Sequence, residues 1–216
     1  MSFTFRSRRR WLVSGLAAAC AVAAAGTTHA QTFPTKPIQI VVGFAAGTTT
    51  DVIARVAAEH MRAKFGVPVV VINKPGANGV IAATEVARAA ADGHTLLATN
   101  TSSMTVNPHL YRKLGYQLSD FTPVAMVTQA PLILTVNPTN ERIGSIKTVA
   151  ELVAYGRANP GALSYAAAGP GNITGLTFRI LNNHAGVKAN EVIYKSAVAS
   201  QLGVLGKEVD AFIDTP

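Results

Sequence analysis

The sequence predicts an α/β fold in two lobes, built from short and largely parallel strands that alternate with helices. From Pro37 onward, short runs rich in β-branched residues alternate with longer segments of helical periodicity. Both halves of this region contain a strand, a glycine-containing loop and a helix in the same order, with the loops at 44–51 and 169–175. An apolar stretch at 121–136 lies between the halves, and we interpret it as a hinge formed by two crossing strands.

The first unit has the clearest pattern. A buried strand is expected at 38–44, followed by a small-residue loop and a helix at 51–65 that Gly66 terminates. One apolar stripe on this helix is formed by Ile53, Ala57, Met61 and Phe65. Further strands are expected at 67–72, 95–99, 163–167, 192–194 and 209–213, and further helices at 81–91 and 197–205.

Two local features mark element ends in the second half. Thr148 and Glu151 have capping-box spacing, which predicts a helix that begins near Ser145 and ends by Gly161. The strand at 209–213 has no later element in the sequence to pair with it. Because complete domains usually protect an open strand edge, we expect a C-terminal portion to be missing.

Residues 1–30 have the composition of an export signal. Four arginines (Arg6, Arg8, Arg9 and Arg10) precede an alanine-rich apolar run at 11–26, and cleavage is expected after Ala30. The alternative is an uncleaved N-terminal anchor. The export route, Sec or twin-arginine, stays open. We reject a lipid anchor at Cys20, because Ala17 stands where lipoprotein signals usually have leucine.

Removing this segment halves the formal charge. The whole chain carries 19 Lys and Arg against 11 Asp and Glu, and the four leader arginines reduce the excess from +8 to +4. The remaining basic residues are scattered, which argues against a nucleic-acid partner. The only Cys and the only Trp, Cys20 and Trp11, also lie in the predicted leader.

The two glycine-containing loops are the candidate binding elements. Each stands where a strand leads into a helix, so its backbone N–H groups and the helix dipole favour an anion. A simple capping role explains either loop alone, but two lobes that each offer one could close on a single carboxylate. Asp51 is expected to hold the first loop in shape by accepting backbone N–H bonds, although contact with a ligand ammonium is an alternative.

The second loop also matches GxGxxxG, with Glu191 about twenty residues beyond its first glycine, which raises a dinucleotide-dependent enzyme as an alternative. Glu191 precedes the next strand, whereas a ribose-binding acid normally follows it. No catalytic or metal-ligating spacing occurs among His60, His94, His109 and His184. We therefore expect no enzyme activity, no cofactor and no metal. Asp210 is expected to be solvent-exposed, and Asp214 is better placed for a ligand.

Four segments together resemble the Bug (TctC-like) family of tripartite tricarboxylate transporter receptors. They are FPTKPIQIVVGFAAGTTTDVIAR at 33–55, VVVINKPGANGVIAATEVARAAADGHTLLATN at 69–100, LSYAAAGPGNITG at 163–175 and YKSAVASQLGVLGKEVDAFID at 194–214. The resemblance implies a two-lobed periplasmic-binding-protein-like fold of type II that is C-terminally incomplete here, with lobes at 31–125 and 126–216. It also implies a periplasmic, monomeric receptor for a small carboxylate that delivers its ligand to membrane permease subunits. A ligand-presenting partner of a sensor kinase is the alternative.

The resemblance also implies a set of ligand-binding residues. These are Phe44, Ala46, Gly47, Thr48, Asp51, Asn100, Thr101, Gly169, Asn172, Thr174 and Asp214. The chain departs from the family pattern at Thr48, where a second glycine is usual, and this larger residue either narrows the pocket or adds a hydroxyl donor.

Overall fold

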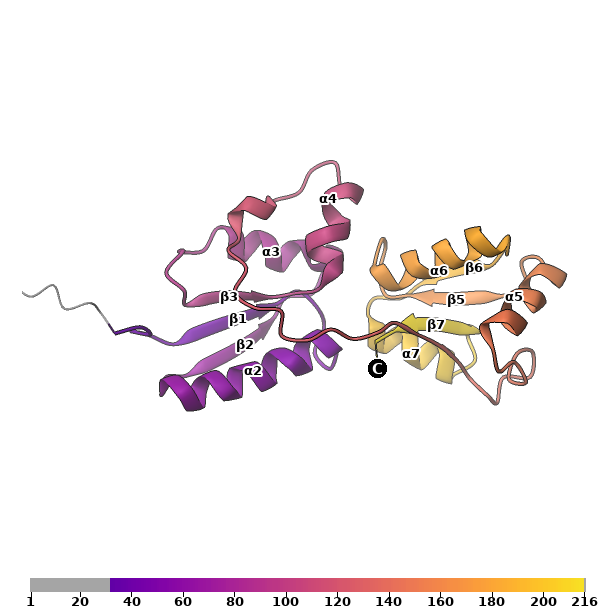
Figure 1. Ribbon diagram of the computed structural model, residues 1–216, viewed down its shortest axis with the longest axis horizontal. Coiled ribbons are helices and arrows are strands. Elements are labelled where there is room, and N and C mark those ends of the chain that lie inside the picture. The colour runs from indigo at the N-terminus through magenta and orange to yellow at the C-terminus, as the bar shows by residue number, and fades with distance from the viewer. Residues whose placement is uncertain (1–31, 216) are drawn as a thin grey trace, which may run out of the picture. The chain divides into compact units, whose positions relative to one another are not determined.

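The computed structural model describes residues 32–215. The predicted leader at 1–30, with Cys20 and Trp11, lies outside the described residues. In the described part, two separate sheets follow each other along the chain (Figure 1). We call the first sheet with its helices, 36–120, the first lobe and the second sheet with its helices, 133–215, the second lobe. The predicted domain bounds at 31–125 and 126–216 stay predictions.

The first lobe contains a three-stranded parallel sheet. Its strands are β1 (Ile38–Val42), β2 (Val69–Asn73) and β3 (Thr95–Ala98), in the order β2-β1-β3. The central strand β1 is the most buried, because it is paired on both edges and covered on both faces. Its run of Ile and Val fits such a site, where β-branched side chains pack well on a pleated surface.

Helices α2 (Thr49–Phe65) and α3 (Val80–Ala87) cover opposite faces of this sheet (Figure 1). The stripe predicted for α2 is displaced, because Ala54 and Ala58 are its most buried apolar residues and pack on Ile40 and Val42. Small side chains on the inner face let the helix lie close to the sheet. The predicted stripe residues, Ile53, Ala57, Met61 and Phe65, are half-buried beside this contact. Gly66 ends the helix in the left-handed conformation, as expected.

Short helical turns that the sequence pattern did not predict complete the first lobe. They are η1 (Ala77–Gly79), the π-helical turn η2 (Ser102–Val106), α4 (Asn107–Leu110) and η3 (Leu118–Asp120). None is long enough to show a helical period. The strand predicted at 95–99 is observed as β3 and ends at Ala98. The polar residues that follow it lead into the helical turn η2.

The expectation of two crossing strands at 121–136 is wrong. Only β4 (Ile133–Val136) forms there, antiparallel to β7 (Ala211–Asp214), and 121–132 has no regular structure. This segment is apolar but has no strand partner among the described residues. Val124 and Met126 are consequently 81% and 82% exposed.

The second sheet has the order β4-β7-β5-β6, with β5 (Ser164–Ala167) and β6 (Asn190–Ile193) parallel to each other. Strand β7 lies between β4 and β5 and is paired on both edges. The predicted open edge at the last strand is therefore wrong. Its second neighbour, β4, comes from far upstream in the chain, and no local pattern announces a pairing of that kind.

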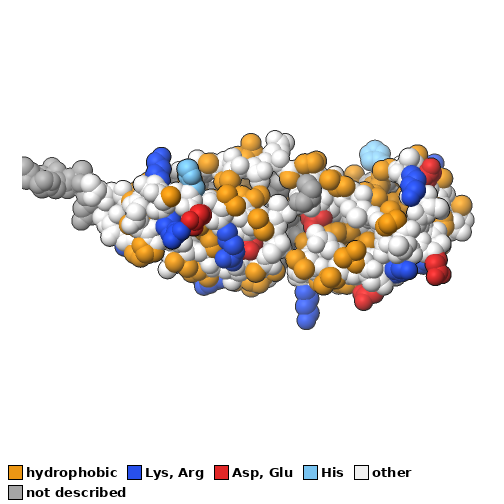
Figure 2. Space-filling model, turned by 90° about the horizontal axis from the view of Figure 1, so that it is seen from below, with side chains coloured by type: hydrophobic (Ala, Val, Ile, Leu, Met, Phe, Trp, Pro, Cys, Tyr) orange, Lys and Arg blue, Asp and Glu red, His pale blue; other side chains and the backbone are white. Residues whose placement is uncertain are grey.

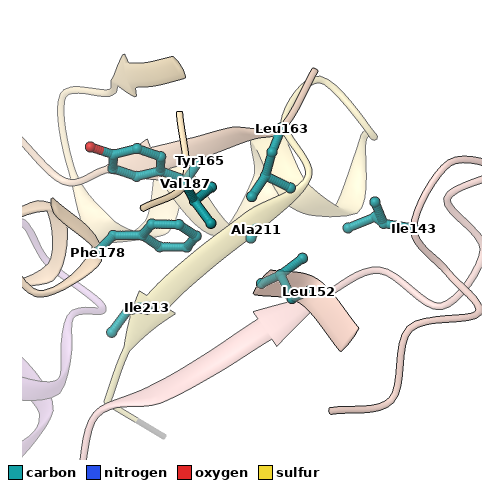
Figure 3. Close-up of a cluster of buried hydrophobic side chains, with 8 residues drawn as sticks. All are labelled: Ile143, Leu152, Leu163, Tyr165, Phe178, Val187, Ala211 and Ile213. Atoms are coloured by element: carbon teal, nitrogen blue, oxygen red, sulfur yellow. The ribbon is translucent and has the colours of Figure 1, made fainter. Parts of the chain in front are cut away.

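Helices α5 (Val149–Ala158), α6 (Ile173–Ala185) and α7 (Ala197–Leu205) complete the second lobe. Successive side chains of β7 point to opposite faces, so Ala211 and Ile213 join the core cluster drawn in Figure 3 while Phe212 packs in a second cluster with Val204 of α7. In the first cluster, Tyr165 and Phe178 stack with ring centroids 4.2 Å apart. The capping box of Thr148 and Glu151 forms at α5, as predicted.

Asp210 is fully buried, which overturns its predicted exposure. Its carboxylate accepts hydrogen bonds from Arg142 Nη2 at 2.7 Å, from the Ser164 amide at 2.8 Å and from the Ser164 hydroxyl at 2.9 Å. Asn140 donates a further bond at 3.2 Å. Asp210 thus joins the start of β7 to the start of β5, and its role is structural.

Charged side chains are scattered over the face shown in Figure 2, in places with a basic and an acidic group side by side, among apolar and uncharged groups. On that face, Lys and Arg form no continuous patch of the kind that nucleic-acid binders present. Within 32–215, no helix has the length and apolar character that crossing a bilayer requires.

Candidate functional site

The first glycine-containing loop leads from β1 into α2 and presents an uncapped helix N-terminus. Thr48 is the N-cap residue, but its side chain makes no capping bond. The first intrahelical bond runs from the Val52 amide to the Thr48 carbonyl, so the amides of Thr49, Thr50 and Asp51 have no acceptor within the helix. Gly47 precedes them, exposed and with φ of 82°. Such an end is suited to an anion.

Asp51 holds this loop in shape, as predicted. Its carboxylate is 2% exposed and accepts hydrogen bonds from the Gly47 amide at 2.9 Å and from Asn73 Nδ2 at 2.8 Å. Arg55, one turn along α2, pairs with both carboxylate oxygens, at 2.9 and 3.1 Å. Burial alone raises the pKa of Asp51, but the hydrogen bonds from Arg55, Gly47 and Asn73 outweigh it and the pKa is lowered.

This arrangement removes the conflict between a carboxylate and an anion at the same helix end. The Asp51 charge is neutralised by Arg55 and faces the interior of the loop. Asn73 also donates to the Phe44 carbonyl at 3.1 Å, so the end of β2 fixes both ends of the loop. The structure thus supports the structural role for Asp51 over contact with a ligand ammonium.

Thr48, Ala46 and Phe44 differ in how far they are exposed and in whether their polar groups are already bonded within the loop. The Thr48 hydroxyl donates to the Ala45 carbonyl at 2.8 Å, so its proton already has an acceptor inside the loop. Ala46 is exposed beside Gly47, and Phe44 is half-buried. Of the two effects considered for Thr48, a hydroxyl donor to the ligand is therefore the less favoured, because that donor is in use.

The second glycine-containing loop leads from β5 into α6, but its helix end is largely satisfied. Asn172 caps α6, because its Oδ1 accepts from the Thr174 amide at 3.0 Å and from the Thr174 hydroxyl at 3.1 Å. The Ile173 amide donates to Ser102 Oγ of the first lobe at 3.1 Å. Gly169 and Gly171 both have positive φ, 104° and 68°. The two loops, which look equivalent in sequence, therefore differ in the amides that they leave open.

Of the polar residues after β3, Ser102 takes part in the contact with the Ile173 amide of α6. Asn100 Oδ1 accepts from the Ser102 amide at 3.0 Å and so starts the helical turn, and Thr101 is exposed. Ser102 and Ser103 are fully buried. The family resemblance implied binding only by Asn100 and Thr101.

Asp214 ends β7 as a half-buried carboxylate. Gln201 Nε2 donates to it at 3.3 Å, and burial raises its pKa, with hydrogen bonds from Thr215 and Gln201 acting in the opposite direction. The next residue, Thr215, shares a hydrogen bond of 2.7 Å with the hydroxyl of Thr49 in the first turn of α2. The end of β7 therefore lies beside the uncapped N-terminus of α2.

Two residues at this site were missed in the sequence. Asn78 donates to the Gly171 carbonyl at 3.2 Å and accepts from Asn172 Nδ2 at 3.0 Å, although it lies in a turn that the sequence marks only as rich in Pro, Gly and Asn. Thr215 follows the last predicted strand, at 209–213, and no role was predicted for it. No periodicity or spacing identifies either, because both act through partners more than 90 residues away in the chain.

Glu191, which with the second glycine-containing loop suggested a dinucleotide site, does not stand where such a site needs it. Glu191 is the second residue of β6 and forms an ion pair with Arg179 of α6, so its position is not that of a ribose-binding acid. His60 is exposed on α2, and His94 is buried beside Asp92. Within the described residues, no group of three or more His, Cys, Asp or Glu could hold a metal ion.

Comparison with known proteins places this geometry in a family. The profile described as "Tripartite tricarboxylate transporter family receptor" (TctC) matches residues 53–216. The chain is 36% identical to protein BugT of Bordetella pertussis over 192 residues, which are 88% of this chain and 58% of BugT.

Solved structures agree. The R. palustris protein Rpa4515, solved with adipate, matches with a TM-score of 0.79 and 31% identity, over 85% of this chain and 60% of that one. MatC (Rpa3494) from Rhodopseudomonas palustris, solved with malate, matches with a TM-score of 0.74 and 32% identity, over 85% and 61%. The chain thus spans about 60% of the length of these relatives. The resemblance read from the sequence motifs is confirmed, and this chain belongs to the TctC family of tripartite tricarboxylate transporter receptors.

Proposed function

We propose that this protein is a periplasmic solute receptor that binds a small carboxylate and delivers it to the permease subunits of a tripartite tricarboxylate-type transporter. The observation that carries the proposal is the uncapped N-terminus of α2, where three amides lack an acceptor beside a left-handed Gly47. Free amides and the positive end of the helix dipole are what a carboxylate requires. The adipate and malate bound in the two related structures are ligands of this chemical class.

In this proposal, the ligand carboxylate lies against Ala46, Gly47 and the first-turn amides of α2. Asp51 contributes indirectly, by holding Gly47. Asn100 and Thr101 after β3, and Gly169, Asn172 and Thr174 in the second loop, form the opposite side of the site. Phe44 and Thr48 shape the first loop from within.

Asp214 adds a condition on the ligand. A carboxylate near the end of α2 would face a second negative charge unless a proton or a donor intervenes. Because the pKa of Asp214 is raised by burial, protonation is easier here than for an exposed aspartate. In its protonated form Asp214 can donate a hydrogen bond, and in its ionised form it favours a ligand with a hydroxyl or ammonium donor.

The test is binding by the 216-residue chain, measured by calorimetry with adipate, malate and the neutral diamide of adipate. We expect the acids to bind and the diamide to bind at least tenfold more weakly, since it cannot place a charge at the helix end. Binding of the diamide as tight as that of adipate, or no binding of any carboxylate, would sink the proposal.

A proline substitution isolates the amide contribution. Thr49→Pro removes one first-turn N–H and suits the first position of a helix, and Thr48 already has the extended backbone that a residue before proline prefers (φ −75°, ψ 158°). Thr49→Ala is the matched control, because both variants lose the hydroxyl that bonds to Thr215. We expect Thr49→Pro to bind about tenfold more weakly than Thr49→Ala, the effect of one charge-assisted hydrogen bond.

Delivery to permease subunits, a monomeric state and export through a leader at 1–30 are further parts of this proposal. N-terminal sequencing of protein recovered from the periplasm checks the leader, and a start at residue 31 is expected. Reconstitution with the permease subunits checks delivery, and transport that does not depend on this chain would contradict it.

A further inference from the structure

Asn78 is half-buried and is the centre of a network of neutral hydrogen bonds in the first lobe. Its carbonyl accepts from Asn107 Nδ2 at 3.0 Å and from Ser103 Oγ at 3.1 Å, and its own Nδ2 donates to Asn107 Oδ1 at 2.9 Å. Asn107 and Ser103 are fully buried. These bonds connect the turn after β2 to the helical turns after β3 and hold the Asn78 side chain in one orientation.

The backbone of Asn78 is left-handed, with φ of 55° and ψ of 39°. Residues other than glycine rarely adopt this conformation, although asparagine tolerates it better than most. Ala77 beside it also has positive φ, 47°. Conformations of this kind persist only where surrounding contacts stabilise them, and they concentrate at functional sites.

The same Asn78 side chain reaches the second lobe. The second proton of Nδ2 is donated to the Gly171 carbonyl at 3.2 Å, and Oδ1 accepts from Asn172 Nδ2 at 3.0 Å. Asn172 is 6% exposed, and its own Oδ1 caps α6. The amide nitrogen and the amide oxygen of both side chains therefore have hydrogen-bond partners, which makes their contact specific in geometry.

A second contact lies beside the first. Ser102 Oγ accepts a hydrogen bond from the Ile173 amide at 3.1 Å. A buried side chain of the first lobe thus bonds to an amide that has no acceptor within α6. Gly171 approaches the first lobe closely as well, because a Cβ built there would stand 2.5 Å from Leu110 Cδ1. Gly171, Asn172 and Ile173, at the start of α6, therefore all contact the first lobe.

We propose that Asn78, Ser102, Asn172 and Ile173 form a clasp that holds the two lobes together when no ligand is bound. In this view the second glycine-containing loop docks on the first lobe, and the clasp sets the fraction of molecules that are closed before a ligand arrives. Apparent affinity scales with the fraction of molecules in the binding-competent state. This consequence for affinity rests on the proposed receptor function, whereas the clasp itself does not.

The test compares three variants in a Cys20→Ser background without ligand. Asn78→Gly removes the clasp side chain and suits the left-handed backbone. Ala77→Gly is the matched control, since it relaxes the same turn and keeps the Asn78 amide. Ser102→Ala removes the acceptor for the Ile173 amide. Spin labels at Ala63→Cys on α2 and Asn183→Cys on α6, both exposed positions, report the distance between the lobes by double electron–electron resonance.

We expect one narrow distance distribution in the parent and in Ala77→Gly, and a second, longer population in Asn78→Gly and Ser102→Ala. Hydrogen exchange at the Ile173 amide should become about tenfold faster in Ser102→Ala, as expected for the loss of a buried hydrogen bond. Exchange at the β1 amides should not change, which shows that the first lobe remains folded.

Two outcomes would overturn the clasp. Unchanged distances in both Asn78→Gly and Ser102→Ala would show that other contacts hold the lobes. Equal opening in Ala77→Gly and Asn78→Gly would show that the turn backbone, and not the Asn78 amide, is responsible. Because all groups in the clasp are neutral, its opening should also be the same at low and high salt, and a strong dependence on salt would contradict it.

Discussion

The carboxylate of Asp51 accepts a hydrogen bond of 2.9 Å from the amide of Gly47 and thereby closes the first loop against α2. Asp51→Asn should lower the free energy of unfolding by about 1–3 kcal/mol, because it weakens the bond to Gly47 and discards the pairing with Arg55. Urea denaturation measures the change. Glu59→Gln, at an exposed pair on the same helix, is the control and should change stability by less than about 0.5 kcal/mol.

The contribution of Asp51 to the stability of the protein should change with pH in a defined direction. The pKa of Asp51 is lowered in the folded protein from its ordinary value of 3.8. Its stabilising contribution is therefore complete above pH 4 and is lost as the pH falls through the lowered pKa. Asp51→Asn should lack this component of acid unfolding. If the parent and the variant lose stability in parallel below pH 4, the Asp51 contacts do not form in solution.

Asp214 should show the opposite sign. Because burial raises its pKa, the folded state holds the proton more firmly than the unfolded state does, and stability increases as the pH falls through the raised pKa. Asp214→Asn should therefore be more stable than the parent at pH 7, and the difference should disappear toward pH 4. Unfolding by urea at the two pH values measures this. A variant that is less stable at pH 7 would contradict the burial argument.

The buried Asp210 should be among the most sensitive positions in the second lobe. Asp210→Ala leaves the Ser164 amide and hydroxyl without their acceptor and removes the partner of Arg142, at an expected cost of about 2–4 kcal/mol. Arg142→Ala should cost less, because the arginine is half-exposed and Asp210 keeps its other donors. The reverse order in denaturation experiments would show that the exposed arginine carries the interaction.

The capping box of α5 offers a local test. Thr148 Oγ1 accepts from the Glu151 amide at 3.2 Å, so Thr148→Ala should reduce stability by about 1 kcal/mol. Thr148→Ser keeps the hydroxyl and should remain within about 0.5 kcal/mol of the parent. A shift in melting temperature is a sufficient measurement. Equal losses in the two variants would assign the effect to the threonine methyl group instead of the cap.

Local features of the fold could be read from the sequence because they depend on residues that are close in the chain. The capping box at Thr148, the end of α2 at Gly66 and the role of Asp51 four residues from Gly47 are of this kind. The helix at 197–205 was located at both ends. Several strand bounds were displaced by one or two residues, since strand ends depend on neighbours in the sheet.

Contacts between residues that are distant in the chain could not be predicted from the sequence. The pairing of β7 with β4, the ion pair of Asp210 with Arg142 and the missing second strand in 121–136 all depend on what another segment presents. For the apolar segment at 121–132 in particular, a strand-like composition was not sufficient, because a strand requires a partner for its backbone groups.

The sequence by itself determined two glycine-containing loops at strand-to-helix junctions and the family to which the chain belongs. Only the tertiary structure decided that the loops differ. The first leaves the amides at the start of α2 open, whereas Ser102, 71 residues away from Ile173 in the chain, occupies an amide of the second. The physical reason is that a helix end exposes its amides by local geometry, but which group satisfies them depends on the surfaces that folding brings together.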